Sequence, residues 1–311
     1  MNSVRVQLTD FDPAYFGQRP LLARHNLHDL DLFSEEAIVE LLDRFPREHI
    51  YAWATGRDHS RPEHNRLAAQ KDVGGATLLQ AVKNGRFWVN LTRIDRVDGE
   101  YRKLIDLIYE QLAAQAPGFE PLSCQGALLI SSPQSITYYH ADAPANMLWH
   151  IRGRKRIWIY PALDERYLKR ESLEDIYAGV RHEYLPFDES FDTDAVRFDI
   201  EPGQWATWPH NAPHRVSNLE GLNISLATEH FTPATVRRQR LYAANRFLRA
   251  RLRLRNLSAR EDGVAAAMKI GLHRIARPLG LDPLQYKRYT PVLKVDADAP
   301  DGVAALSVGG N

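Results

Sequence analysis

The sequence predicts a mainly β protein with flanking helices, built around a sandwich or small barrel of the jelly-roll type. Breaks at Gly153, Pro161, Pro202-Gly203 and Pro209 separate several short β-rich segments between residues 121 and 232. Many short strands with turn residues between them are typical of such folds. The expected strands are Gly126–Ser131, Ile136–Asp142, Met147–Ile151, Arg156–Tyr160, Val196–Ile200, Gln204–Trp208, Arg215–Asn218 and Asn223–His230.

Two amphipathic helices are expected before these strands. Ser34 caps the first, whose apolar residues repeat at helical spacing up to Phe45. Asp98 caps the second, which ends near Pro117. Short strands are expected between the two helices, at His49–Ala54 and Arg86–Leu91.

Helical patterns return in the last third of the chain. Residues 162–195 form a polar insertion with a helix around Leu173–Val180, and residues 261–277 form another helix, whereas the tail from Pro300 is expected to be frayed. After Pro233 one helix face carries Leu241, Ala244, Leu248 and Leu252. We therefore divide the chain into N-terminal helices and strands that pack on the core (1–120), the jelly-roll core (121–232) and a C-terminal helical region with a role in dimerisation (233–311).

The composition is that of an ordinary globular protein and excludes several classes. The single cysteine, Cys124, excludes an internal disulfide and a cysteine-based zinc cluster, and it favours a reducing cytoplasm. No stretch approaches the roughly 20 apolar residues of a membrane-spanning helix. The first ten residues lack the apolar core of a signal peptide. We expect a cytoplasmic protein without a membrane partner.

A candidate metal-binding pair stands at the end of one expected strand. His140-Ala-Asp142 follows Ile136–Tyr139, and residues i and i+2 of a strand point to the same face. Both side chains can therefore bind one metal ion. Imidazole and carboxylate suit iron, manganese or zinc, although this tripeptide alone occurs in many proteins without a metal.

The residues that follow resemble the central motif of the JmjC-type hydroxylases. That family places an asparagine and a strand after its His-x-Asp, then a Gly-x-Lys-Arg turn and an aromatic-aliphatic strand that ends in proline. The matching elements here are Asn146, Met147–Ile151, Gly153–Arg156 and Ile157–Pro161. The resemblance implies a double-stranded β-helix (jelly-roll/cupin) core and an Fe(II)- and 2-oxoglutarate-dependent oxygenase.

The same resemblance implies a third metal ligand on a returning strand. The family pattern is a glycine turn, an apolar strand, a proline, a short turn and then His-x-Val, and here Pro209, His214 and Val216 match it. We expect His214 to complete the iron site with His140 and Asp142. His210 is the competing candidate, at the start of the turn. His150 and His230 are expected to be strand or core histidines.

Three further residues are expected at the 2-oxoglutarate site. In the asparaginyl-hydroxylase branch of the family, a lysine of the Gly-x-Lys-Arg turn binds the distal carboxylate, and a threonine three residues before the first histidine assists it. Lys155 and Thr137 occupy those places, and we group Asn146 with them. A dianion needs a fixed cation. The competing reading of Lys155 is a solvated lysine, because arginines surround it at 152, 154 and 156.

Two features of this expected site stay open. Thr137 and His140 have opposite parity on a regular strand, so Thr137 reaches the site only if the strand bends or bulges. Glu229 stands fifteen residues after His214, where the asparaginyl hydroxylases carry an asparagine, and an acid near a dianion is unfavourable unless it is protonated or turned away. Ala212-Pro213 also stand where JmjC proteins often place aromatic residues.

Positive charge is concentrated in one C-terminal segment. Residues 235–260 carry nine arginines and no acid, so the rest of the chain has 31 basic against 39 acidic residues. The segment Arg237–Arg260 suits a homodimer contact or internal ion pairs, which we favour over nucleic-acid binding.

The function expected from these residues is an oxygenase that uses 2-oxoglutarate and dioxygen to hydroxylate a protein side chain or a small molecule. One alternative is a cupin metal enzyme that does not use 2-oxoglutarate. Another is a non-catalytic cupin-like interaction protein. The substrate-selecting loops are expected at 55–80 and 162–195.

Overall fold

Two long antiparallel strands organise the fold. The computed structural model describes residues 6–282 and 289–306. Strand β8 (Ala145–Ile159) pairs with β11 (His214–Phe231) along nearly its whole length. The sequence predicted two strands in place of each, and this was wrong. Gly153 has φ +83° and Gly221 has φ +64°, so the glycines bend the strands without ending them.

The bend of β8 at Gly153 could not hold another residue. A Cβ there would lie 2.6 Å from the carbonyl oxygen of Leu222. Glycine is therefore needed both for the positive φ and for the close approach of the two chains.

The two halves of the long strands belong to two layers. The first half of β8 pairs with β10 (Gln204–Thr207), and the second half of β11 pairs with β6 (Leu122–Ser131). The second half of β8 pairs with β9 (Val196–Ile200), and the first half of β11 pairs with β7 (Ile136–His140). Beyond β10 and β6 the sheet continues through β2 (Leu21–His25), β1 (Leu8–Thr9), β5 (Phe87–Thr92), β3 (Ile50–Ala54) and β4 (Arg66–Ala69). The predicted mainly β, jelly-roll fold class is confirmed.

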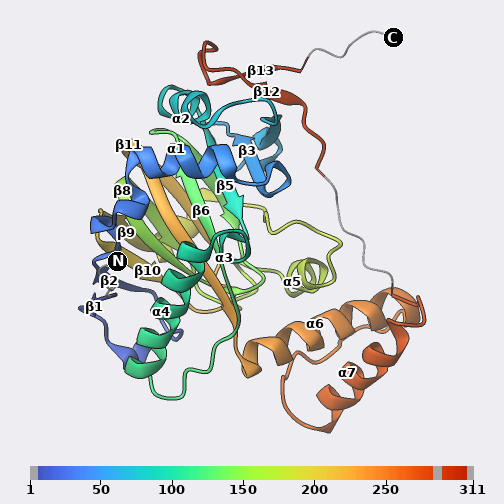
Figure 1. Cartoon of the computed structure of the whole chain (residues 1–311). Coiled ribbons are helices and arrows are strands. Elements are labelled where there is room, and N and C mark those ends of the chain that lie inside the picture. Colours follow the sequence, from blue (N-terminus) through green and yellow to red (C-terminus); the bar gives the residue numbers. More distant parts are fainter. Residues whose placement is uncertain (1–5, 283–288, 307–311) are drawn as a thin grey trace.

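Helices from the first part of the chain lie against one face of this sheet (Figure 1). They are α1 (Glu35–Arg44), α2 (Gly75–Asn84), α3 (Ile94–Val97) and α4 (Gly99–Gln115). The predicted caps are confirmed, since Ser34 accepts a hydrogen bond from the backbone of α1 and Asp98 accepts two from α4. The sequence analysis missed α2, which starts after Gly74 without a side-chain cap.

The helices after the jelly roll form a separate group. Helix α5 (Arg170–Tyr177) packs on α6 (Pro233–Leu252), and α6 with α7 (Val264–Ala276) forms a hairpin that projects from the sheet (Figure 1). Of the predicted buried face of α6, Leu241, Ala244 and Leu248 are buried. Leu252 is 54% exposed, so that part of the prediction was wrong: the residue is the last of the helix.

The C-terminal segment returns to the sheet. Strand β12 (Leu293–Val295) runs parallel to β4, and β13 (Val303–Ala305) pairs with β12. The prediction of a frayed tail from Pro300 was therefore wrong up to residue 306, because backbone pairing orders this composition of small residues. Residues 307–311 of that tail lie outside the described residues. No helix in the described ranges is long and apolar enough to cross a membrane.

Candidate active site

A bulge in β7 brings Thr137 and His140 to the same cavity. His140 pairs with His214 and Thr137 pairs with Val216, so three steps along β7 face two along β11. The extra residue reverses the strand parity between them. Thr137 and His140 therefore both line the cavity, as the sequence analysis required of a bulged strand.

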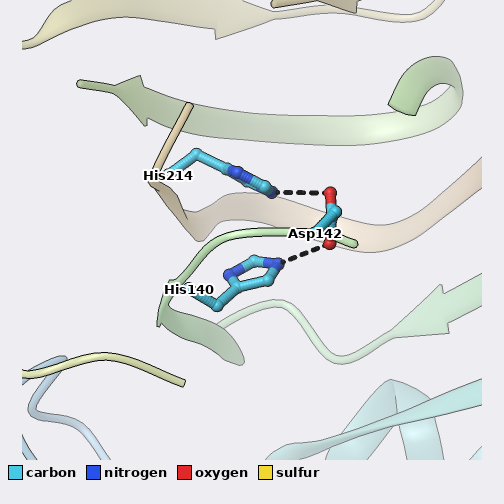
Figure 2. Close-up of side chains that lie close together, drawn as sticks. All are labelled: His140, Asp142 and His214. Carbon is cyan, nitrogen blue, oxygen red and sulfur yellow. Dashed lines mark ion pairs between the residues drawn. The ribbon is translucent and has the colours of Figure 1, made fainter. Parts of the chain in front are cut away.

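The three predicted metal ligands come together from two strands and the loop after β7. Their candidate ligand atoms all lie within 4.8 Å of one another. The Nε2 atom of His140 lies 3.4 Å from Asp142 Oδ1, and the Nε2 atom of His214 lies 3.4 Å from Asp142 Oδ2 (Figure 2). One carboxylate thus faces two imidazoles, each through a different oxygen.

Backbone carbonyl groups set the tautomers of both histidines. The Nδ1–H of His140 donates to the Tyr138 carbonyl (2.8 Å), and the Nδ1–H of His214 donates to the Ala212 carbonyl (3.1 Å). Both Nε2 lone pairs then face the carboxylate of Asp142. That arrangement is repulsive unless a cation lies between them, and ligand histidines are commonly oriented in this way.

The environment favours the ligand form of His214 and Asp142, whereas the neighbouring Asp142 outweighs burial and raises the pKa of His140. Burial, together with the nearby His140, lowers the pKa of His214 to about 4. Burial alone would raise the pKa of Asp142, but the two histidines outweigh it and hold that pKa at about 2. A neutral imidazole and an ionised carboxylate are the forms that bind a metal. Two histidines and one carboxylate with open positions fit an oxygen-activating iron site.

Neighbouring side chains fix Asp142. The Nδ2 atom of Asn146 donates to Asp142 Oδ2 (3.0 Å), and the Nδ2 atom of Asn211 donates to the Asp142 carbonyl (2.9 Å). His210 contacts the adjacent carbonyl of Ala143 through Nε2 (2.9 Å). His210 is not in the metal-ligand group and holds the loop instead.

Lys155 differs from the arginines beside it. All three neighbouring arginines form ion pairs with acids of this chain: Arg152 with Glu35, Arg156 with Asp199, and Arg154 with Asp199, Glu201 and Glu220. The side chain of Lys155 lines the cavity, is 4% exposed and has no hydrogen-bond or acidic partner within the described ranges. Burial lowers the pKa of its ammonium to about 7. The competing interpretation, that Lys155 is a solvated lysine, is therefore wrong.

The cavity that joins these groups has a volume of about 500 Å³. His140, Asp142, Thr137, Asn146 and Lys155 all line it. The sequence analysis missed several other lining residues. A cluster of polar side chains, formed by Ser131, Ser135 and Asn218, lies in the wall. The Nδ2 atom of Asn218 donates hydrogen bonds to both serine hydroxyls (2.9 and 3.0 Å).

The expected substrate loops contribute unequally. From the 162–195 insertion, six residues between Ile176 and Tyr184 reach the cavity wall, whereas none of residues 55–80 does. Tyr289, on the C-terminal segment, also lines the cavity, and nothing in the sequence indicated this contact. His150 and His230 are buried, as expected of core histidines.

The family follows from the sequence itself. The profile of the cupin-like domain family matches residues 65–228, which is more than half of the chain. The chain therefore belongs to the cupin-like domain family, and the expected resemblance to JmjC/cupin-type proteins is confirmed. No curated protein matches the sequence significantly.

Several solved structures share the fold. An X-ray structure of Escherichia coli YcfD superposes with a TM-score of 0.52 at 14% identity, covering 89% of this chain and 71% of that chain. A crystal structure of YcfD described as an E. coli ribosomal oxygenase gives 0.50 at 13% identity, with 94% and 76% covered. YcfD in complex with cobalt and 2-oxoglutarate gives 0.50 at 12% identity, with 94% and 75% covered. At these identities the likeness establishes the fold.

Proposed function

We propose that this protein is an Fe(II)- and 2-oxoglutarate-dependent oxygenase that hydroxylates a protein side chain or a small molecule. One observation carries the proposal: Lys155, a buried ammonium without a partner among the described residues, lines the same cavity as His140 and Asp142, two members of the two-histidine, one-carboxylate group. The cobalt and 2-oxoglutarate complex of YcfD, a protein of the same fold, supports it.

Each residue then has a physical role. His140, Asp142 and His214 would hold iron and leave open positions for co-substrates. Lys155, with Thr137, would bind the far carboxylate of 2-oxoglutarate through charge-assisted hydrogen bonds. Asn146 keeps the Asp142 carboxylate in place. When bound, iron supplies dioxygen activation: one oxygen atom enters the substrate C–H bond as hydroxyl, and the other oxidises 2-oxoglutarate to succinate and carbon dioxide.

Glu229 no longer conflicts with an anionic co-substrate. Burial, reinforced by the nearby Asp142 and Glu183, raises the pKa of Glu229 to about 7. Its Oε2 atom accepts a hydrogen bond from Gln125 Nε2 (2.6 Å). The acid is therefore protonated below about pH 7, which weakens the repulsion that the sequence suggested.

Anaerobic titration of the apoprotein with Fe(II) and 2-oxoglutarate tests the proposal. We expect the visible charge-transfer band of a metal-chelated 2-oxoacid, strongly weakened in Lys155→Met and unchanged in the matched Arg154→Met. Iron binding without a band would instead favour a cupin enzyme that uses another acid or none. Absence of metal binding would favour a non-catalytic interaction protein.

We also propose that two copies of the chain associate through α7. Val264, Met268, Leu272 and Ile275 repeat at helical spacing on this helix and are between 47% and 77% exposed. A projecting hairpin with an apolar face can pack on its own copy about a twofold axis. Light scattering should give a dimer for the wild type and a monomer for Met268→Glu. A wild-type monomer at high concentration would contradict the proposal.

The arginine-rich segment fits internal ion pairing better than nucleic-acid binding. Four of its nine arginines form ion pairs with acids of this chain: Arg238 with Glu261, Arg246 with Asp175, Arg249 with Glu171 and Glu174, and Arg260 with Asp262. The pairs of Arg246 and Arg249 anchor α6 to α5, the pair of Arg238 anchors α6 to the loop before α7, and the Arg260–Asp262 pair lies within that loop. Steeply salt-dependent binding of nucleic acid would contradict the assignment.

We propose a reducing, cytoplasmic location. Cys124 is the only cysteine, and it is a free thiol. Burial raises its pKa to about 11, so the thiol is weakly reactive. Fractionation of the native cells would test this assignment.

A further inference from the structure

A second cleft, separate from the cavity, is formed largely by the connection between β3 and β4. Its volume is about 410 Å³, and the side chains that line it are those of Thr55, Arg57, His64, Arg66, Arg86 and Asp301. The first four of these belong to the 55–80 segment, none of whose residues lines the cavity. The segment that the sequence indicated as a substrate loop therefore has a binding surface of its own.

Backbone pairing brings the residues of this cleft to one edge of the sheet. Ala54, the last residue of β3, pairs with Arg66 on β4 and with Phe87 on β5. The end of β3 and the starts of β4 and β5 therefore lie side by side. The backbone N–H of Arg86 donates to the Asp301 carbonyl (2.9 Å), which adds the connection between β12 and β13. Four segments that are distant in sequence thus meet at the cleft.

The cleft has an excess of positive charge. Three guanidinium groups line it, against the single carboxylate of Asp301. That carboxylate lies 3.8 Å from the Nε atom of Arg86, whereas Arg57 and Arg66 form no ion pair with any residue that the structure describes. Two positive charges are therefore left uncompensated. A cleft lined by charge of one sign concentrates ions of the opposite sign, and here the charge matches a dianion.

Two hydrogen-bond donors in the wall have no acceptor within residues 6–282 and 289–306. Thr55 is 8% exposed, and its Oγ1 atom is buried without a partner. Arg86 donates through its two terminal nitrogens to Gln134 (3.2 and 2.9 Å), but its Nε atom is buried and makes no hydrogen bond. Buried polar groups are usually hydrogen-bonded, so these donors indicate a ligand that brings several acceptor oxygens.

Two tyrosine hydroxyls fix the loop that carries the arginines. The backbone N–H of Gly56 donates to Tyr138 Oη (2.7 Å), and Asn65 Nδ2 donates to Tyr184 Oη (2.6 Å). These anchors directly precede Arg57 and Arg66 in the sequence, so both arginines project from a fixed backbone. Tyr184 also lines the cavity. The cleft is therefore preformed and lies next to the cavity wall.

We propose that this cleft binds the phosphate group of a phosphorylated ligand, a monoester dianion, between Arg57, Arg66 and Arg86. A planar guanidinium donates two parallel hydrogen bonds to a phosphate, and a phosphate monoester offers three strong acceptor oxygens. A carboxylate brings only one charge and two oxygens, so it matches the cleft less well. The inference does not depend on the proposed oxygenase function, because the site contains no residue of the iron or co-substrate sites.

Calorimetric titration of the full-length protein with inorganic phosphate tests this inference. Acetate, a monoanion, is titrated in parallel at the same ionic strength and at a pH where phosphate is a dianion. We expect phosphate to bind at one site per chain, at least about tenfold more tightly than acetate. Equal binding of the two anions, or no binding of phosphate at millimolar concentrations, would overturn the inference.

Variants of exposed arginines locate the binding. Arg57→Gln and Arg66→Gln replace exposed side chains, so the fold is preserved, and each should weaken phosphate binding about tenfold. Arg61→Gln is the matched control: it removes the same charge from the same loop, but Arg61 does not line the cleft. Phosphate binding that is unchanged in both cleft variants, or weakened as much by Arg61→Gln, would contradict the assignment.

A second measurement separates this cleft from the buried ammonium of the cavity. Lys155→Met should bind phosphate as tightly as the wild type. In crystals of the full-length protein soaked with tungstate, a tetrahedral dianion that scatters strongly, we expect an anomalous peak beside Arg57, Arg66 and Arg86. A peak at Lys155 alone, or loss of phosphate binding in Lys155→Met, would overturn the inference and leave the oxygenase proposal intact.

Discussion

The cavity has two charged regions that are built in opposite ways. At one, a single ammonium, Lys155, lies among hydroxyl and amide groups and has no ion-pair partner in the described part of the chain. At the other, two carboxyl groups, Glu183 and Glu229, line the cavity together with aromatic rings and form no ion pair with an arginine or lysine that the structure describes. Each region is costly to bury in the free protein. The comparison teaches that one cavity can hold buried groups of both charges.

The largest effect is expected from the predicted metal ligands. His140→Ala and His214→Ala should each abolish iron binding and turnover, because two remaining ligands hold the ion poorly. Metal content after anaerobic loading, measured by elemental analysis, checks this expectation. The matched variant His210→Ala should retain one iron per chain, since His210 lies outside the metal-ligand group. Full iron content in His214→Ala would contradict the ligand assignment.

A smaller loss is expected from removing the cation. Lys155→Met should weaken 2-oxoglutarate binding by roughly 10- to 100-fold, the value of a charge-assisted hydrogen bond. The same variant should be more stable than wild type without ligands, by on the order of a few kcal/mol, because the pKa of Lys155 is lowered to about 7. This gain in the free energy of unfolding should be complete below pH 7, where the wild-type lysine is charged in both the folded and the unfolded state. It should vanish as the pH approaches 10.5, the pKa of the lysine in the unfolded state. Denaturant titrations across this range measure it.

The acid region should show the opposite pH dependence. The pKa of Glu229 is raised to about 7, above its ordinary value, so its burial cost is absent at low pH and full above pH 7. Glu229→Gln should therefore stabilise the ligand-free protein by up to about 3 kcal/mol above pH 7 and have little effect near pH 4. If the stability gains of this variant and of Lys155→Met changed in the same direction with pH, the two regions would not have opposite charge.

The smallest of these effects concerns the backbone that separates the two layers. Gly153→Ala should destabilise the protein by about 1–3 kcal/mol, through the positive φ and the contact with the Leu222 carbonyl. Gly221→Ala is the matched control: it shares the positive φ, but its Cβ would meet nothing within 4 Å. Thermal unfolding of both variants separates strain from steric overlap, and equal losses would show that the contact with Leu222 contributes nothing.

The sequence predicted the cation region well and missed the acid region. His140, Asp142 and Lys155 lie in one short local motif, so their spacing on adjacent strands was readable. Glu183 and Tyr289 come from a long insertion and from the C-terminal segment, and only the three-dimensional fold brings them together. Glu229 was noticed as a departure, but its neighbours were not. The long strands were misread because glycine usually ends a strand, whereas Gly153 bends one.

The most direct test of this account is an anaerobic crystal structure of the protein with Fe(II) and 2-oxoglutarate, with iron located by anomalous scattering. The account predicts iron bound by His140, Asp142 and His214, with the distal carboxylate of 2-oxoglutarate against the Nζ atom of Lys155. Iron at another group of residues, or 2-oxoglutarate with its distal carboxylate turned away from Lys155, would contradict it.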